Sequence, residues 1–363
     1  MIINMETNTN KSKTEKKEKL NAIKNNPRLL IIIAAAVVVL AIVISVIVAV
    51  VNNGKKAGTV ENVATQTMGG LDVLCEPSSI ALIADQGFLV TDVYGKQIWL
   101  INSISGSIYA GKGSVEDMYG QPLGGYNDSE LKDSLFKEPW AISPFLNGYA
   151  VSDTQNNAIR LISSTTTQTV NGYSEELEIG DLGVKFDTPT GLTTDEAGNL
   201  YISETGKGAI RRVTPDGEVT TVAEGLNGPM GLYAAGDYIY VAETAANRIV
   251  RVKDGQIEVI AGTGEETPEG GLGDGSIKKA TFRYPQGVAV ADDGTVFVAD
   301  TVSSTVRMIR NNKVTTILQR EGDELDIEMY PVSPRGLFID NGSLYVCDPF
   351  ARRVYVLKLE DVY

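Results

Sequence analysis

The chain has 363 residues, of which 37 are glycine, 7% are aromatic and none is histidine, and its formal net charge is −14. The absence of histidine excludes histidine general bases, Ser-His and Cys-His nucleophile pairs, and histidine-ligated zinc. Residues 1–56 hold nine of the 32 basic and three of the 46 acidic residues, which leaves 23 basic and 43 acidic residues, a net charge of −20, in 57–363. A surface this acidic repels phosphate backbones, so no nucleic-acid partner is expected.

The amino-terminal segment is basic and then strongly apolar. Residues 1–28 contain too few apolar residues to fold and are predicted to form a disordered, cytoplasmic basic tail. Residues 29–51 are apolar except for Ser45, and at about 1.5 Å per residue they can cross a hydrocarbon core of about 30 Å. We therefore expect a single transmembrane helix at 29–51. It is longer than the apolar region of about 7–15 residues in a cleaved signal peptide, so an uncleaved signal anchor is expected.

The charges beside this helix predict its orientation. Seven Lys or Arg residues precede it and two follow it closely, which favours a cytoplasmic amino terminus. The chain is then a single-pass protein of the cell membrane whose remaining residues are extracytoplasmic. Residues 52–69 are predicted to be a polar stalk, and 70–363 a folded domain.

One pattern recurs six times in this domain. A Pro is followed two positions later by a small residue, and then come an apolar run, a tight turn, a second apolar run closed by an acid, and a third apolar run. In the clearest copy, Pro285-Gln286-Gly287 begins the pattern and Asp300 closes the second run. Such short β-branched and aromatic runs between Gly, Asn or Asp residues are typical of strands. The six prolines are Pro77, Pro139, Pro189, Pro229, Pro285 and Pro334.

Five of the six units have a fourth run, whereas the sixth unit ends without one. An additional run, Leu71-Asp72-Val73-Leu74, precedes the first unit. We expect this run to pair with the last unit and close a ring, because closure removes the open edge of a sheet. The sequence thus predicts an all-β fold, a six-bladed β-propeller, preceded by the transmembrane helix.

The connections between units resemble a known repeat. Ala261-Gly262-Thr263-Gly264, Gly273-Asp274-Gly275 and Ala280-Thr281-Phe282, followed by Pro285, are similar to the inter-blade pattern of the NHL-repeat family. Gly125-Tyr126-Asn127-Asp128, with Phe136 and Pro139, is a looser copy. The resemblance covers about 70–363 and implies an NHL-like propeller. Because propellers of this family include enzymes, RNA binders and protein-binding platforms, it does not fix the function.

An acid closes the second strand of every unit. A catalytic site occurs once, so a residue type repeated in all six units is expected to be structural. Each carboxylate is expected to accept backbone N–H groups and to fix the following turn. These acids are Asp92, Asp153, Glu204, Glu243, Asp300 and Asp348.

Three other acids are candidate metal ligands. Asp128 and Asp274 lie in Gly- and acid-rich loops, where they either form turns or hold Ca²⁺ or another divalent cation, although the Asp-x-Asp-x-Asp-Gly spacing is absent. Glu76, which precedes Pro77, resembles in its context the first metal ligand of lactonase propellers, but Glu138 before Pro139 does too. No other cofactor is expected.

Two further residue types invite a functional interpretation. Arg160, Arg211 and Arg307 recur in the third strands, and we expect blade-to-blade ion pairs or solvated strand faces rather than an anion site.

Cys75 and Cys347 both belong to the predicted closing blade. Two free, buried thiols are expected. A disulfide is the alternative, but it requires Cys75 to lie in the connecting loop, because fourth and second strands are too far apart for a bridge.

The long connections are 111–138, 170–188, 262–284 and 319–333, and each joins a fourth strand to the next first strand. They therefore emerge on one face, together with the six acid turns. We call this edge of the ring the loop-rich face, and we expect it to bind a protein, peptide or glycan.

The alternative function is a metal-dependent lactonase- or esterase-like hydrolase with a carboxylate-bound cation in the channel. No catalytic residue is assigned, since no nucleophile–base pair is identifiable.

Overall fold

The computed structural model describes residues 66–67, 74–102, 105–113, 116, 118, 120, 122, 124–163, 167–169, 185–265, 273–319 and 330–362. In these ranges, no helix is both long and apolar enough to cross a membrane. The predicted tail at 1–28, the predicted membrane helix at 29–51 and most of the predicted stalk at 52–69 lie outside the described residues.

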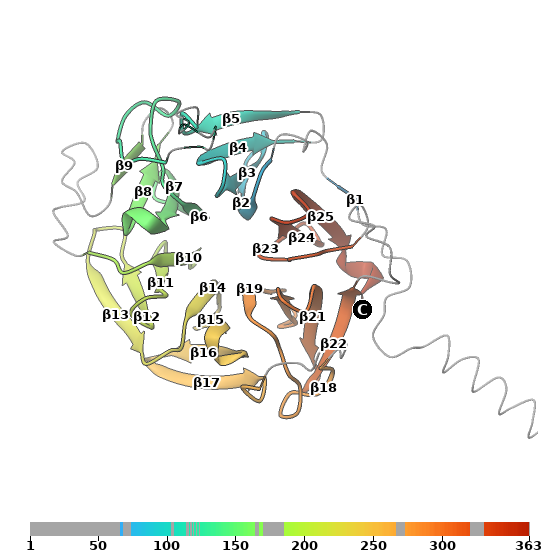
Figure 1. Cartoon of the computed structure of the whole chain (residues 1–363). Helices are drawn as coiled ribbons and strands as arrows, with labels where there is room; N and C mark the ends of the chain where they lie inside the picture. Colours follow the sequence, from blue (N-terminus) through green and yellow to red (C-terminus); the bar gives the residue numbers. More distant parts are fainter. Residues whose placement is uncertain are drawn as a thin grey trace, which may run out of the picture. The chain divides into compact units, whose positions relative to one another are not determined.

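The described strands form six antiparallel sheets that stand around a central axis as the blades of a propeller (Figure 1). Blade 1 consists of β2 (Pro77–Ile83), β3 (Gly87–Asp92), β4 (Gln97–Ile101) and β5 (Gly106–Ala110). Blade 2 consists of β6 (Pro139–Phe145), β7 (Gly148–Asp153), β8 (Ala158–Ile162) and β9 (Thr167–Thr169). Blade 3 consists of β10 (Pro189–Thr194), β11 (Leu200–Glu204), β12 (Ala209–Val213) and β13 (Val219–Glu224). Blade 4 consists of β14 (Pro229–Ala235), β15 (Tyr238–Glu243), β16 (Arg248–Lys253) and β17 (Gln256–Ala261). Blade 5 consists of β19 (Pro285–Val290), β20 (Val296–Asp300), β21 (Thr305–Arg310) and β22 (Lys313–Gln319), and β18 (Gly275–Ser276) pairs at its outer edge. Blade 6 consists of β23 (Leu337–Asp340), β24 (Ser343–Asp348), β25 (Arg353–Lys358) and β1 (Gln66–Thr67). The predicted six-bladed, all-β propeller is confirmed.

The ring closes through β1. Gln66 pairs with Val356 and Thr67 with Tyr355, antiparallel to β25, so an amino-terminal strand completes the last blade (Figure 1). Closure by an upstream strand is as predicted, but the residues differ from the predicted run at 71–74. Of that run only Leu74 is described. It lies outside any strand and is fully buried against blades 1 and 6. The apolar side chain of Leu74 therefore packs where blades 1 and 6 meet.

The core lies between the blades. Six apolar clusters are found, and each joins two neighbouring blades. The cluster between blades 5 and 6, for example, brings Phe297 and Val306 against Leu344 and Tyr355. Each sheet is thus covered on both faces by its neighbours, which explains why its strands are apolar along most of their length.

The Pro-x-Gly pattern is explained by contact between first strands. A Cβ atom on Gly287 would lie 2.0 Å from the carbonyl oxygen of Arg335 in the next blade, and one on Gly336 would lie 2.1 Å from that of Ser78. Real Cβ atoms do not approach oxygen so closely, so these positions favour glycine where first strands crowd around the axis. The Gly336–Ser78 contact repeats the arrangement across the join, as a closed ring requires.

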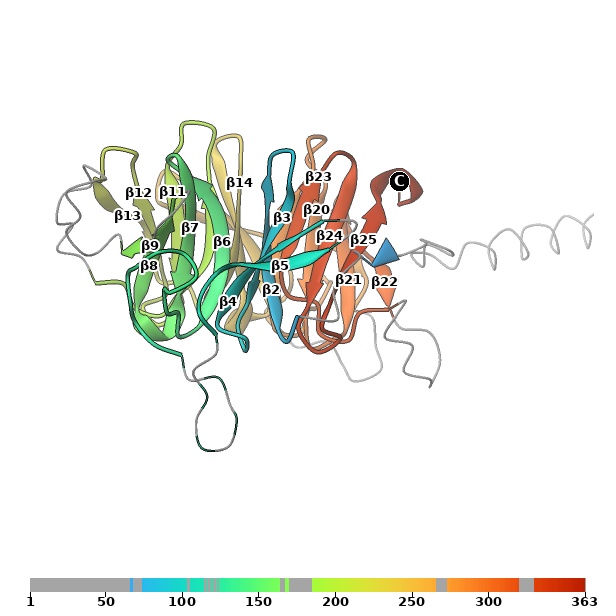
Figure 2. The same cartoon turned by 90° about the horizontal axis from the view of Figure 1, so that it is seen from above.

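The two edges of the ring differ. The turns between first and second strands form one edge, the hairpin face. The acid turns and the connections between blades form the other, the loop-rich face defined above. Both edges can be followed in Figure 2, where the strands run from one to the other.

Candidate functional site

The six repeated acids lie at the loop-rich ends of the second strands, and all are buried. Asp92 accepts the backbone N–H groups of Cys75 at 2.8 Å and of Glu76 and Gly95 at 2.9 Å. Asp348 accepts three such groups in the last blade in the same way. Burial raises the pKa of both carboxyl groups, although these backbone N–H groups oppose the rise. Asp92 and Asp348 thus tie the segment before the first strand of their blade to the turn after the second strand.

Three of the acids also hold the recurring arginines. Arg160 donates to Asp153 at 2.9 Å, Arg211 to Glu204 at 3.1 Å, and Arg307 to Asp300 at 2.9 Å. Each pair joins second and third strands of one sheet. The expectation of blade-to-blade ion pairs or solvated strand faces was therefore wrong. The reason is that third-strand side chains at this position point toward the carboxylate of their own blade.

Asp128 and Asp274 contact the two fully buried arginines. Arg160 Nε lies 3.0 Å from Asp128 Oδ1, and Arg307 Nη2 lies 2.7 Å from Asp274 Oδ1. Asp274 also accepts the backbone N–H of Thr316 at 3.0 Å. Both loops that resemble the NHL inter-blade pattern are thus anchored to a buried guanidinium. A cation bound by either carboxylate would lie beside that positive charge.

The third candidate metal ligand, Glu76, lies apart from these two. Its Oε1 atom is 3.0 Å from Nη1 of Arg335. Among the described residues, no group of three or more Asp, Glu or Cys side chains is arranged to hold a metal ion.

Both cysteines are free thiols in the described structure. Cys347 is completely buried in the cluster between blades 6 and 1, and burial raises its pKa. Cys75 is partly exposed, and its Sγ lies 3.6 Å from Nη2 of Arg352. The expected free thiols are both present, but only Cys347 is buried as predicted; Cys75 is partly exposed because it lies outside the strands, before β2.

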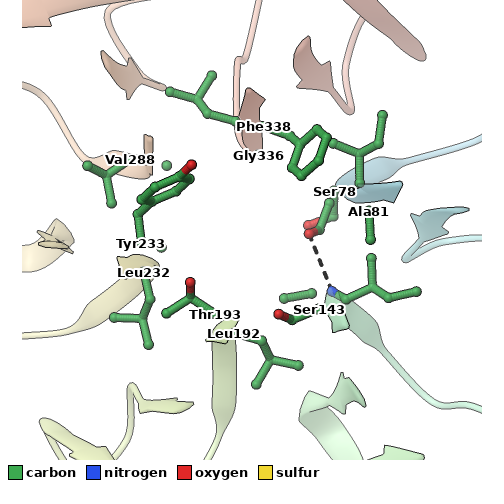
Figure 3. Close-up of a pocket in the computed structure, with 18 of the residues that line it drawn as sticks. Ser78, Ala81, Ser143, Leu192, Thr193, Leu232, Tyr233, Val288, Gly336 and Phe338 are labelled. Atoms are coloured by element: carbon green, nitrogen blue, oxygen red, sulfur yellow. Dashed lines mark hydrogen bonds between the residues drawn. The ribbon is translucent and has the colours of Figure 1, made fainter. Parts of the chain in front are cut away.

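A channel of about 390 Å³ runs along the axis and is lined by the first strands of all six blades (Figure 3). Its lining is amphipathic. Ser78, Ser143 and Thr193 carry hydroxyl groups, whereas the partly exposed Tyr233 and Phe338 carry aromatic rings (Figure 3). The volume lies within the range of about 300–1,000 Å³ that is typical of small-molecule sites.

Four of the residues that follow the six prolines line the channel at its end on the loop-rich face. Arg335 from blade 6 stacks on the ring of Trp140 from blade 2, with its guanidinium carbon 4.3 Å from the ring centroid. Its Nε donates to Gln286 of blade 5 at 3.2 Å, and its Nη1 contacts Glu76 of blade 1. Four blades therefore contribute to one side-chain cluster across the axis. We call the four residues the channel mouth: Ser78, Trp140, Gln286 and Arg335.

The loop-rich face also carries an exposed apolar surface. The second residue after the acid is Tyr94 in blade 1, Val302 in blade 5 and Phe350 in blade 6, with 41%, 47% and 69% of its surface exposed. Blades 5, 6 and 1 are consecutive, so these three exposed residues lie on neighbouring blades along one half of the face, and we call them the apolar arc. The same position in blades 2, 3 and 4 holds Gln155, Gly206 and Ala245.

Neither the channel mouth nor the apolar arc was identified from the sequence alone. The signal was present, however. The residue after each Pro and the second residue after each acid differ in every blade, whereas the residues around them repeat.

Comparison with known proteins supports the fold and limits what can be said of function. The sequence model of the teneurin NHL domain matches residues 178–335. Teneurin-3 of Danio rerio is 32% identical over 154 residues, which are 38% of this chain and 6% of that protein. The protein SUPPRESSOR OF QUENCHING 1, chloroplastic, of Arabidopsis thaliana is 26% identical over 245 residues, which are 66% of this chain and 19% of that protein. The chain therefore spans less than a fifth of either relative.

Among solved structures, virginiamycin B lyase from Staphylococcus aureus is similar, with a TM-score of 0.54 and 16% identity over 81% of this chain and 99% of that one. This likeness shows a shared fold only. Together, the domain match and the six blades support the predicted NHL-repeat propeller.

Proposed function

We propose that the chain is a membrane-anchored, extracytoplasmic binding platform that holds a protein, peptide or glycan against its loop-rich face. The membrane anchor is the apolar segment 29–51, and the flanking charges place the propeller outside the cytoplasm. Carbonate extraction tests the anchor: the full chain should stay with the membrane, and deletion of 29–51 should release it.

The observation that carries the binding role is the apolar arc. Ten large apolar side chains are exposed among the described residues, and six of them lie in turns or connections of the loop-rich face: Tyr94, Met118, Tyr126, Tyr284, Val302 and Phe350. Contiguous exposed apolar surface is characteristic of interaction sites. Because Val302 and Phe350 carry no polar groups, the arc favours a protein or peptide over a glycan.

The frame beneath the arc is rigid. Each turn of the arc follows a buried acid that accepts backbone N–H groups, as Asp348 does from Val332, Ser333 and Ala351. Binding to a fixed surface loses little conformational entropy, which favours affinity.

The test compares two pairs of substitutions on opposite faces. Tyr94→Ser with Phe350→Ser removes the arc, and Leu82→Ser with Leu146→Ser removes exposed apolar residues of the hairpin face as a matched control. A partner is captured by cross-linking to the wild-type chain, identified, purified and titrated. We expect the arc variant to bind at least about tenfold more weakly and the control variant to bind as the wild type does. Equal loss in both variants, or loss in the control alone, would refute the proposal.

A further inference from the structure

The channel mouth has hydrogen-bond donors that no acceptor in the described structure uses. Arg335 uses Nε and Nη1, which leaves Nη2 without a hydrogen bond to a described residue. Gln286 accepts from Arg335 through Oε1, which leaves its amide N–H₂ group facing no described acceptor.

One ion pair carries the charge at the mouth. Arg335 is the one cationic residue, and Asp195 the one anionic residue, among the described residues that line the channel. Glu76 pairs with Nη1 of Arg335, so Nη2 is the part of the guanidinium that is left to bind a ligand. An Arg guanidinium presents a planar fork of donors that matches a carboxylate. Trp140 holds this fork in place by stacking against it.

The channel below the mouth suits an apolar group. Tyr233, Leu337 and Phe338 are partly exposed and line it together with the hydroxyl-bearing residues. A ligand with a charged head and a short apolar body would place the head at Arg335 and the body among these side chains.

We propose that the channel mouth binds a carboxylate with an apolar body, with Arg335 and Gln286 as donors and Trp140 as the wall that orients Arg335. The carboxylate belongs to a free organic acid or to the carboxyl end of a peptide. This site is separate from the apolar arc and does not rest on the proposed partner binding.

Fluorescence of Trp140 provides the readout. The chain has two tryptophans, and Trp99→Phe leaves Trp140 as the single reporter. This change removes no hydrogen bond, because Nε1 of Trp99 is buried without a partner among the described residues. The full chain is titrated with phenylacetate and with phenylacetamide, its neutral isostere. In a second arm it is titrated with the peptide Ala-Ala-Phe carrying a free or an amidated carboxyl end.

We expect saturable binding of phenylacetate, of the free-acid peptide, or of both, and at least about tenfold weaker binding of the matching amides. Response to phenylacetate identifies a free acid, and response to the peptide alone identifies a peptide end. No response to either acid, or equal binding of acids and amides, would overturn the proposal.

Variants test the assignment of the donors. Arg335→Gln should abolish binding, and Gln286→Glu should do the same while keeping the shape of the side chain, because it sets a carboxylate against the ligand. Arg310→Gln, at the hairpin end of β21, is the control and should bind as the wild type does. Phe350→Ser should also leave phenylacetate binding unchanged, so failure of this site and failure of the partner-binding proposal are distinguishable. Binding that survives in both Arg335→Gln and Gln286→Glu would contradict the assignment.

Discussion

At the scale of single residues, two buried arginines hold the connections of the loop-rich face in place. Arg160 and Arg307 have no exposed surface, and each pairs with a second-strand acid and with an acid in the preceding connection. The rings of Phe136 and Phe282 lie about 5 Å from the two guanidinium carbons. A buried charge needs such partners, because its desolvation is otherwise uncompensated.

Removing one partner should therefore be costly. Asp300→Ala leaves Arg307 with Asp274 as its only carboxylate and removes the acceptor for the backbone N–H of Arg283. We expect the free energy of unfolding to fall by about 3–5 kcal/mol, measured by urea denaturation.

The matched control is Asp133→Ala. Asp133 pairs with Lys112 at 3.4 Å where the side chains are 61% and 50% exposed, so the loss should stay within about 0.5 kcal/mol. Equal stability of Asp300→Ala and the parent would show that the repeated acids are not structural.

The same contacts lead to a prediction about calcium. Asp128 and Asp274 are each within 3.0 Å of a buried guanidinium nitrogen, so a divalent cation there would be repelled. The midpoint of thermal unfolding of the full chain should not change when a chelator is replaced by Ca²⁺. A saturable rise with Ca²⁺ would mean that a metal competes successfully with the arginines.

The sequence predicted where the acids lie but not what they contact. Repetition in all six blades identified Asp92, Asp300 and the others as structural candidates. It could not show that Asp274 reaches Arg307, because 33 residues separate them. Only the position of the connection against β21 brings them together.

At the scale of strands, the crowding of first strands decides which residue follows each Pro-x pair. Gly191, Gly231, Gly287 and Gly336 all face a carbonyl oxygen or backbone atom of the next blade. Blades 1 and 2 hold Ser79 and Ala141 instead. The Ser79 hydroxyl accepts the backbone N–H of Ile142 at 3.3 Å and so links these two blades by a side chain.

Gly287→Ala tests this crowding. The added Cβ would lie 2.0 Å from the carbonyl oxygen of Arg335, so blades 5 and 6 must separate, and overpacking of this kind typically costs about 1–3 kcal/mol. Ala141→Gly at the equivalent position of blade 2 is the control and should cost about 1 kcal/mol or less. Chemical denaturation measures both, and a neutral Gly287→Ala would show that the first strands are not closely packed.

Strands with apolar side chains were predictable, and the strand that closes the ring was not. β2 to β25 repeat one pattern of runs and turns. β1 is the dipeptide Gln66–Thr67. It pairs through its backbone at the outer edge of blade 6, and two polar residues give no apolar pattern by which a strand could be predicted. The apolar run at 71–74 was the stronger signal, and its described residue Leu74 packs in the core instead.

At the scale of the whole molecule, the repeats share what builds the ring and differ in what faces the solvent. The acids, the prolines and the interblade clusters recur around the axis. The channel mouth and the residues at the positions of the apolar arc do not recur. A platform that binds one partner needs such asymmetry, since six equivalent faces would offer no single site.

The most direct test of the loop-rich face as a binding surface is site-specific photo-cross-linking of the full chain in its native membrane. A photoreactive phenylalanine analogue replaces Phe350 in the apolar arc in one variant and Leu146 on the hairpin face in another; both residues are exposed. We predict that the probe at position 350 forms one discrete cross-linked product, which disappears when Tyr94→Ser is added, and that the probe at position 146 does not form it. The same product from both positions, or a product only from position 146, would contradict the account.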